Sequence, residues 1–190
     1  RHPGRDRAGS GSKHAIIERM ALLAITVLGH DRPGIIADVT AALALRDANV
    51  EDSSMTLLGG FFAWTLVVGS EAQPAAVAAD LAFLESDELV VTVFEVAERP
   101  ASAGSAVPYV ISVHGADRVG IVSAITAAIA SFDGNITDLQ TRLGGGLFVV
   151  IAEADFPPGT QEEQLRAALA EVGTQVGVEV TVIPAETDVL

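Results

Sequence analysis

The chain has 190 residues and a formal net charge of −14, from 11 Lys and Arg against 25 Asp and Glu. Its 49% hydrophobic content can form a buried core, which excludes wholesale disorder, and the lack of cysteine excludes disulfides, thiol catalysis and thiolate metal sites. So acidic a protein is repelled by phosphate groups, which argues against direct binding to nucleic acid or to an anionic membrane.

Residues 1–19 differ from the rest because they are basic and rich in Arg, Gly, Ser and Pro, without apolar periodicity. We expect a flexible basic extension, either native or a remnant of expression. A second stretch of small residues and proline, 99–107, predicts a linker. These two segments bound two predicted domains, 20–98 and 108–190. No apolar run is long enough to span a membrane and no secretory leader is recognisable, so the expected location is the cytoplasm.

The first domain contains a regular succession of predicted elements. An apolar run at 22–28 predicts a strand, and the Arg32-Pro33-Gly34 turn then opens a helix. The apolar stripe of this helix is Ile36, Val39 and Leu43, widened by Ile35 and Ala42. Two strands, 50–58 and 61–68, flank a Gly-Gly turn that suits a tight hairpin. A second helix over 74–84 and a closing strand at 90–96 complete the domain.

The second domain repeats the first. Residues 29–52 align without a gap to residues 115–138, at an offset of 86, and the glycine turn of the hairpin also recurs. The identical pairs include Asp31/Asp117, Arg32/Arg118, Gly34/Gly120, Ile35/Ile121, Thr40/Thr126, Asp47/Asp133, Asn49/Asn135 and Asp52/Asp138. An internal repeat of this length indicates two copies of one small domain.

The order of elements in each copy is therefore βαββαβ. Right-handed crossovers place both helices on one face of a four-stranded antiparallel sheet. The predicted fold class is α+β, with two ferredoxin-like domains.

Two short motifs give this pattern a family resemblance. The first strand-to-helix turn reads Gly-His-Asp-Arg-Pro-Gly-Ile at 29–35, and Asp47 and Asn49 follow the helix. On these residues each copy, 22–97 and 108–184, resembles an ACT domain, a small module that senses amino acids. The tandem arrangement without an attached enzyme resembles the glycine cleavage system transcriptional repressor group.

The turn also has the chemistry of a small-ligand site. Gly34 and Gly120 lie where free N–H groups at a helix N-terminus could bind a carboxylate, and glycine allows close approach. Asp31 or Asp117 could face the ammonium group of an amino acid. Both aspartates could instead serve only as helix N-caps.

In the ACT family the ligand lies between adjacent domains and touches this turn and the asparagine after the helix. The asparagine amide can both donate and accept hydrogen bonds, and we expect it close to the turn, although it could be only a turn residue. The ligand contacts that the resemblance implies are His30, Asp31, Gly34, Ile35 and Asn49, and Asp117, Gly120, Ile121 and Asn135.

The two turns differ at two positions. Pro33 is replaced by Val119, and His30 by Ala116. A proline in the first helical turn would fix the backbone before binding, so the first copy is predicted to dominate ligand binding. His30 has no partner at ligand spacing, and no metal site is expected.

Catalysis is not expected. No Gly-x-Ser-x-Gly motif occurs, and Lys13 is the only lysine. Acylphosphatases share this fold class, but an aspartate precedes Arg32 and Arg118 here and would repel phosphate. We therefore expect a non-catalytic regulator without a cofactor, which senses a small amino acid such as glycine. It would act on a protein partner or as a homodimer, with transcriptional control implied by the resemblance. The alternatives are a pairing module with vestigial sites and a small enzyme of ferredoxin-like fold.

Overall fold

A computed structural model describes residues 21–97 and 106–185. The chain divides into two compact units, called here unit 1 (residues 21–97) and unit 2 (residues 106–185). The predicted extension at 1–19 and residues 99–105 of the predicted linker lie outside the described residues.

Unit 1 has the predicted order of elements. It consists of β1 (Ala21–His30), α1 (Ile35–Ala44), β2 (Asn49–Leu58), β3 (Phe61–Ser70), α2 (Pro74–Leu81), a 3₁₀ turn (Ala82–Leu84) and β4 (Leu89–Val96). Its sheet has the order β2-β3-β1-β4, and every neighbouring pair is antiparallel.

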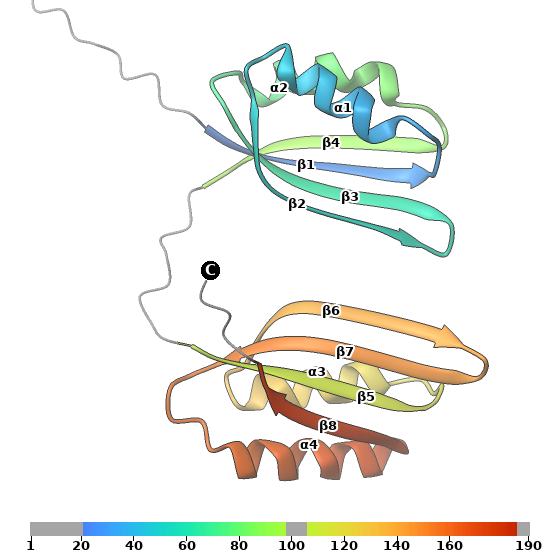
Figure 1. Ribbon diagram of the computed structural model, residues 1–190, viewed down its shortest axis with the longest axis vertical. Coiled ribbons are helices and arrows are strands. Elements are labelled where there is room, and N and C mark those ends of the chain that lie inside the picture. The colour runs from blue at the N-terminus through green and yellow to red at the C-terminus, as the bar shows by residue number, and fades with distance from the viewer. Residues whose placement is uncertain (1–20, 98–105, 186–190) are drawn as a thin grey trace, which may run out of the picture. The chain divides into compact units, whose positions relative to one another are not determined.

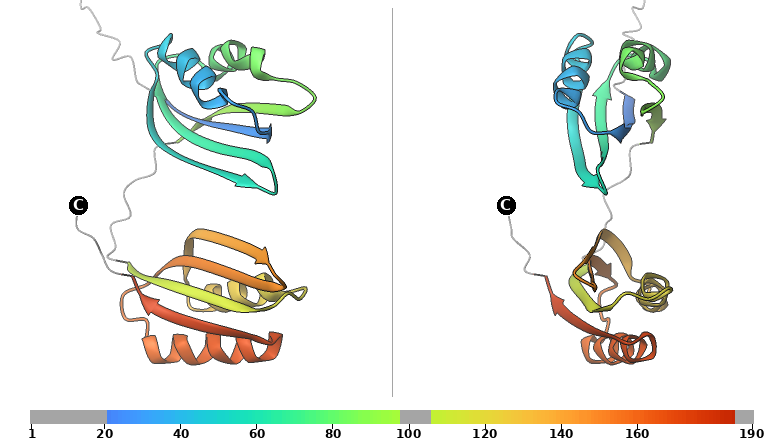
Figure 2. Two further views of the ribbon diagram at one scale, coloured as in Figure 1. Left: turned by 45° about the vertical axis from the view of Figure 1, so that its right-hand side comes forward. Right: turned by 90° about the vertical axis from the view of Figure 1, so that its right-hand side faces the viewer.

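Unit 2 repeats this topology. It consists of β5 (Val107–Ala116), α3 (Ile121–Ser131), β6 (Asn135–Gly144), β7 (Leu147–Phe156), α4 (Glu162–Val176) and β8 (Val178–Pro184), with the sheet order β6-β7-β5-β8. In each unit both helices cover one face of an antiparallel sheet (Figures 1 and 2). The predicted α+β class with two ferredoxin-like βαββαβ domains is confirmed.

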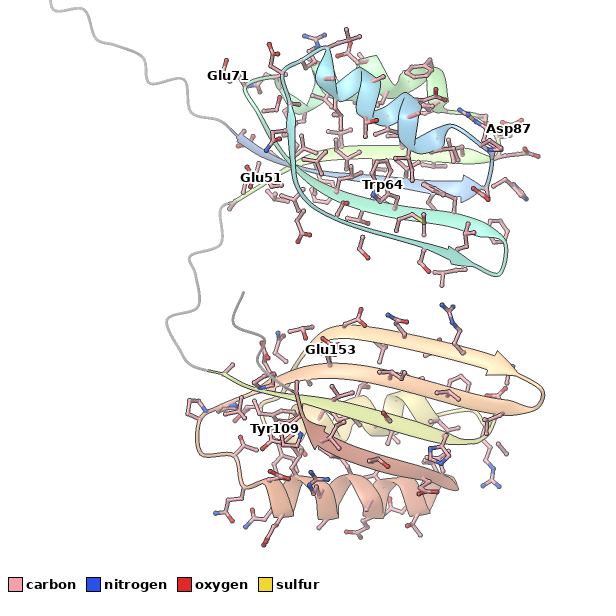
Figure 3. All side chains as sticks on the ribbon, in the orientation of Figure 1. Glu51, Trp64, Glu71, Asp87, Tyr109 and Glu153 are labelled. Carbon is pink, nitrogen blue, oxygen red and sulfur yellow. The ribbon has the colours of Figure 1, made fainter. Side chains whose placement is uncertain are left out.

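Each unit has its own apolar core between helices and sheet. Leu23, Ile25 and Val27 alternate along β1 and are fully buried, as expected for a strand with one covered face. Trp64 belongs to the core of unit 1 and Tyr109 to that of unit 2 (Figure 3). Apolar burial of this kind supplies most of the free energy that stabilises a small domain.

The predicted apolar stripe of α1 is buried except at Ile36. Ile35, Val39 and Leu43 are buried, whereas Ile36 is 42% exposed. The helix begins at Ile35, which directs the i, i+4, i+8 series into the core and leaves Ile36 at the edge of the helix layer. The first turn of α1 therefore presents an apolar side chain outside the core.

In each unit a glycine near the end of the first strand, just before the turn into the first helix, lies very close to the start of the last strand. A Cβ added at Gly29 would lie 2.6 Å from Leu89 Cα and would overlap the carbonyl oxygen of Glu88. At Gly115 the nearest obstacle is a side-chain atom, Val178 Cγ1, at 2.9 Å. Glycine is thus required more strictly in unit 1 than in unit 2.

Strands β2 and β6 form one edge of their sheets, and each contains an irregularity near its start. The register shifts between Val50 and Asp52 in β2, and between Ile136 and Asp138 in β6. Each shift is a β-bulge, which leaves one residue unpaired and bends the strand.

Candidate functional site

The candidate site of unit 1 is built around the turn between β1 and α1. Gly34 is the N-cap of α1 with φ of 93°, a left-handed conformation that favours glycine, and its carbonyl accepts the hydrogen bond of Asp38 N at 2.9 Å. Because no side chain caps α1, the interpretation of Asp31 as an N-cap is wrong. Gly120 of unit 2 has the same role with φ of 97°, which excludes Asp117 as a cap in the same way.

The position of Pro33 also differs from the prediction. Since Gly34 is the N-cap and α1 begins at Ile35, Pro33 precedes the cap and does not belong to the first helical turn. It therefore cannot pre-form that turn in the way expected from the sequence. Any difference in binding between the two units must come from other residues.

A cleft of about 510 Å³ opens between this turn and the edge strand β2. Its lining residues are Asp31, Arg32, Gly34, Ile35, Ile36, Ala37, Met55, Leu57 and Phe62. Three of the predicted contact residues, Asp31, Gly34 and Ile35, thus border one cavity. The wall also includes isoleucine, methionine, leucine and phenylalanine, so the cleft is lined by large apolar residues as well as small ones.

The charged groups of the cleft lie together at the turn. Arg32 Nη2 donates to Asp38 Oδ2 at 3.0 Å, and Arg32 Nη1 donates to the carbonyl of Pro33 at 3.2 Å. These contacts hold the guanidinium beside Gly34, where a Cβ would be 3.8 Å from Arg32 Nη1. A guanidinium has five N–H donors, so donors remain for a ligand. Arg32 thus pairs with a carboxylate of its own unit.

His30 lies outside the cleft lining. It is the last residue of β1, its backbone N donates to the carbonyl of Glu88 at 2.8 Å, and its ring is 5.1 Å from that of Phe61. Phe61 pairs with His30, and the next residue, Phe62, is buried in the core. The aromatic pair therefore lies at the same end of the sheet as the turn, but on the face away from the helices and the cleft.

Asn49 lies at the opposite end of the sheet from the turn. It pairs with Gly69, which also pairs with Leu22 near the start of β1, whereas the turn follows His30 at the other end. Eight residues of strand separate Leu22 from His30, roughly 26 Å at the usual rise. The expectation that the asparagine is close to the turn is therefore wrong within one unit. Asn135 has the same placement in unit 2, because it pairs with Asp155 and thus lies beside Pro108.

The turn of unit 2 has a different arrangement of charge. Arg118 extends to the C-terminal end of α4, where its Cζ would be 2.8 Å from a Cβ added at Gly177. A cation at a helix C-terminus interacts favourably with the helix dipole. The partner that Arg32 has in Asp38 is replaced by Ala124 in unit 2. Ile121, like Ile35, is 1% exposed, so each contributes to the core more than to the surface.

A second cleft, which the sequence analysis missed, lies between α1 and α2. It measures about 560 Å³ and is lined by Asp38, Ala41, Ala42, Leu45, Arg46, Asp80 and Phe83. Arg46 donates two hydrogen bonds to Asp80, at 2.5 and 3.0 Å; they raise the pKa of Arg46 and lower the pKa of Asp80. The partners are 34 positions apart in the sequence, so no local sequence pattern reveals this pair.

In residues 21–97 and 106–185, no group of three His, Asp or Glu side chains could hold a metal ion. None of the helices in the described part of the chain has the length and apolar character that a membrane span requires.

The comparisons with known proteins agree with the topology and the repeated turn. The model of the ACT domain matches residues 21–95 and 108–182. The chain belongs to the ACT domain family. It carries two copies in tandem, and the structure gives each copy a complete βαββαβ unit.

Single-domain relatives resemble one ACT domain of this chain. A UPF0237 protein of Methanosarcina mazei is 37% identical over 75 residues, which are 39% of this chain and 82% of the relative. A UPF0237 protein of Pyrobaculum aerophilum is 38% identical over 74 residues, 38% of this chain and 82% of the relative.

Two solved structures resemble the whole tandem. A protein of unknown function from Galdieria sulphuraria has a TM-score of 0.72 at 28% identity, over 88% of this chain and 99% of that one. A protein provisionally assigned as a glycine cleavage system transcriptional repressor has a TM-score of 0.65 at 19% identity, over 87% and 98% of the two chains. At 19% identity, the second likeness shows a shared fold and no more.

Proposed function

We propose that this tandem ACT protein is a non-catalytic sensor that binds a free amino acid at the β1–α1 turn of unit 1. The observation that carries the proposal is the cleft beside Gly34, in which a carboxylate, Asp31, and a guanidinium, Arg32, border the same cavity. An amino acid presents the complementary pair of charges, an ammonium and a carboxylate. Charge-assisted hydrogen bonds to both groups would orient the ligand.

Asn49 can join this site only from a second copy of the chain, because it lies at the far end of its own sheet. We propose a homodimer in which the turn of one protomer and Asn49 of its partner contact the same ligand. Binding and dimerisation would then be coupled, which gives a regulatory protein an output that depends on ligand concentration.

We propose that ligand binding changes the affinity of this protein for a protein partner. Control of transcription is one process that such a partner could carry out. The net charge of −14 argues against contact with DNA, so an effect on transcription would pass through that partner. The competing proposal is that the protein is a pairing module without a ligand. In that case the half-exposed apolar side chains of β2 would form its interface.

A thermal unfolding screen of the full chain against the twenty amino acids tests the proposal. Binding at a hundredfold excess over Kd stabilises a protein by roughly 2.7 kcal/mol. We expect Asp31→Ala to abolish this stabilisation and the matched variant Asp117→Ala to keep it. If none of the twenty changes the unfolding temperature, the sensor proposal fails and the pairing module is favoured.

A further inference from the structure

We propose that the cleft of unit 1 selects an amino acid with an apolar side chain of about four heavy atoms, such as leucine or methionine, over glycine. The inference rests on the proposed function and names the class of ligand. It is carried by the walls of the cleft, whereas the proposed function is carried by the charges at its turn.

The first observation is the exposure of the apolar wall. Met55 is 46% exposed, Leu57 is 49% exposed, and with Ile36 they line the cleft from two different elements. Met55 pairs with Trp64 and Leu57 with Phe62, so both side chains belong to the face of the sheet that the helices cover. They remain exposed because α1 leaves this edge of the sheet bare. Glycine would leave these side chains in water, whereas an apolar side chain would cover them.

The second observation is the arrangement of charged and apolar side chains along the cleft. Asp31 and Arg32 border the turn, and the apolar side chains of β2 form the opposite wall. A ligand whose ammonium and carboxylate contact the turn would direct its side chain toward Met55 and Leu57. The occupant that fits both walls is zwitterionic at one end and apolar at the other.

Unit 2 supplies an internal comparison. At the offset of 86, Met55 corresponds to Thr141, Ala37 to Ser123 and Asp38 to Ala124. The wall of unit 2 is therefore smaller and more polar, and its arginine lacks the anchoring carboxylate. The residues of unit 2 can therefore be substituted into the wall of unit 1, because the same fold already accommodates them at the matching positions.

Calorimetric titration of the full chain with leucine, methionine, serine and glycine tests the proposal. Burial of one methylene group changes affinity by a factor of about four. With partial burial of four apolar side-chain heavy atoms, we expect leucine and methionine to bind about 30-fold more tightly than glycine or serine. Met55→Thr and Ala37→Ser should each reduce the leucine affinity about three- to tenfold and leave the glycine affinity unchanged. The control Thr141→Met, at the matching position of unit 2, should leave both affinities unchanged.

Each way in which the proposal can fail gives a different experimental result. If glycine and serine bind as tightly as leucine, or Met55→Thr leaves the preference intact, the selectivity proposal is overturned while the sensor function stands. If no amino acid binds, the function itself fails. If Met55→Thr lowers the sedimentation mass of the ligand-free chain without changing leucine affinity, the wall is an interface between copies and the proposal is wrong. Far-UV circular dichroism identifies a variant that fails to fold, and Ala37→Ser then provides the test.

Discussion

The close approach at Gly29 gives a quantitative prediction for the end of the sheet that positions the site. In Gly29→Ala the new Cβ would lie 2.6 Å from Leu89 Cα and 2.9 Å from Glu88 C, both backbone atoms. Because backbone cannot move aside as a side chain can, the start of β4 must shift. The shift would break the hydrogen bond from His30 N to Glu88 O, now 2.8 Å long.

The expected cost combines two effects. Overpacking of this kind costs about 2 kcal/mol and loss of a backbone hydrogen bond about 1 kcal/mol, so the loss is about 3 kcal/mol. For a domain of 60–100 residues this lowers the unfolding temperature by roughly 12–24 °C. In the matched variant Gly115→Ala the nearest atom is in a side chain, Val178 Cγ1 at 2.9 Å. The nearest backbone atoms, Val178 Cα and Gly177 O, are farther away than at Gly29, at 3.1 and 3.2 Å, so this variant should cost less, about 1 kcal/mol.

Scanning calorimetry of the full chain, with hydrogen exchange to assign each transition to a unit, measures both losses. Gly29→Ala should destabilise unit 1 and leave the protection of unit 2 amides unchanged. If the two alanine variants lower the unfolding temperature equally, or Gly29→Ala is neutral, the argument from backbone contact is refuted.

Three further predictions concern the site and its surroundings. Asp31→Ala and Asn49→Ala chains, each defective in amino-acid binding alone, should regain binding when mixed and refolded together, because a mixed dimer restores one complete site; titration that shows no recovery would argue against a composite site. Asn49→Ala should weaken binding more than Asn135→Ala, because the arginine of the unit 2 turn extends to α4; equal losses in calorimetry would contradict this ranking. The hydrogen bonds from Arg46 lower the pKa of Asp80, so the ion pair stabilises the fold above the unfolded carboxylate pKa near 4, and the effect is lost as pH falls through the folded value. Urea midpoints of wild type and Asp80→Asn should therefore differ at pH 7 and converge on acidification, and a gap that persists at pH 2 would refute the assignment.

The fold could be predicted because two copies of one pattern reinforced each other. Alternation along 22–28, the helical stripes and the glycine turns each indicate local structure, and the offset of 86 repeats them. The topology then follows from general rules on crossovers. Local pattern and chain connectivity sufficed for the fold.

The site was less predictable because it depends on register and on side-chain direction. The separation of Asn49 from the turn follows from the length of the strands and their pairing, which the motif does not contain. The exposure of Ile36 depends on the residue at which α1 begins, a shift of one position. The different directions of Arg32 and Arg118 reflect partners that lie elsewhere in the fold, Asp38 in one unit and the end of α4 in the other.

The bulges at the start of β2 and β6 have a consequence for self-association. An added strand needs an unbroken row of backbone donors and acceptors, and the bulge after Val50 interrupts that row. Regular pairing along the free edge of β2 is therefore confined to residues 52–58. Because the bulge also bends and twists the strand, it makes addition of a further strand along the whole edge less favourable, which protects an otherwise open sheet edge against aggregation.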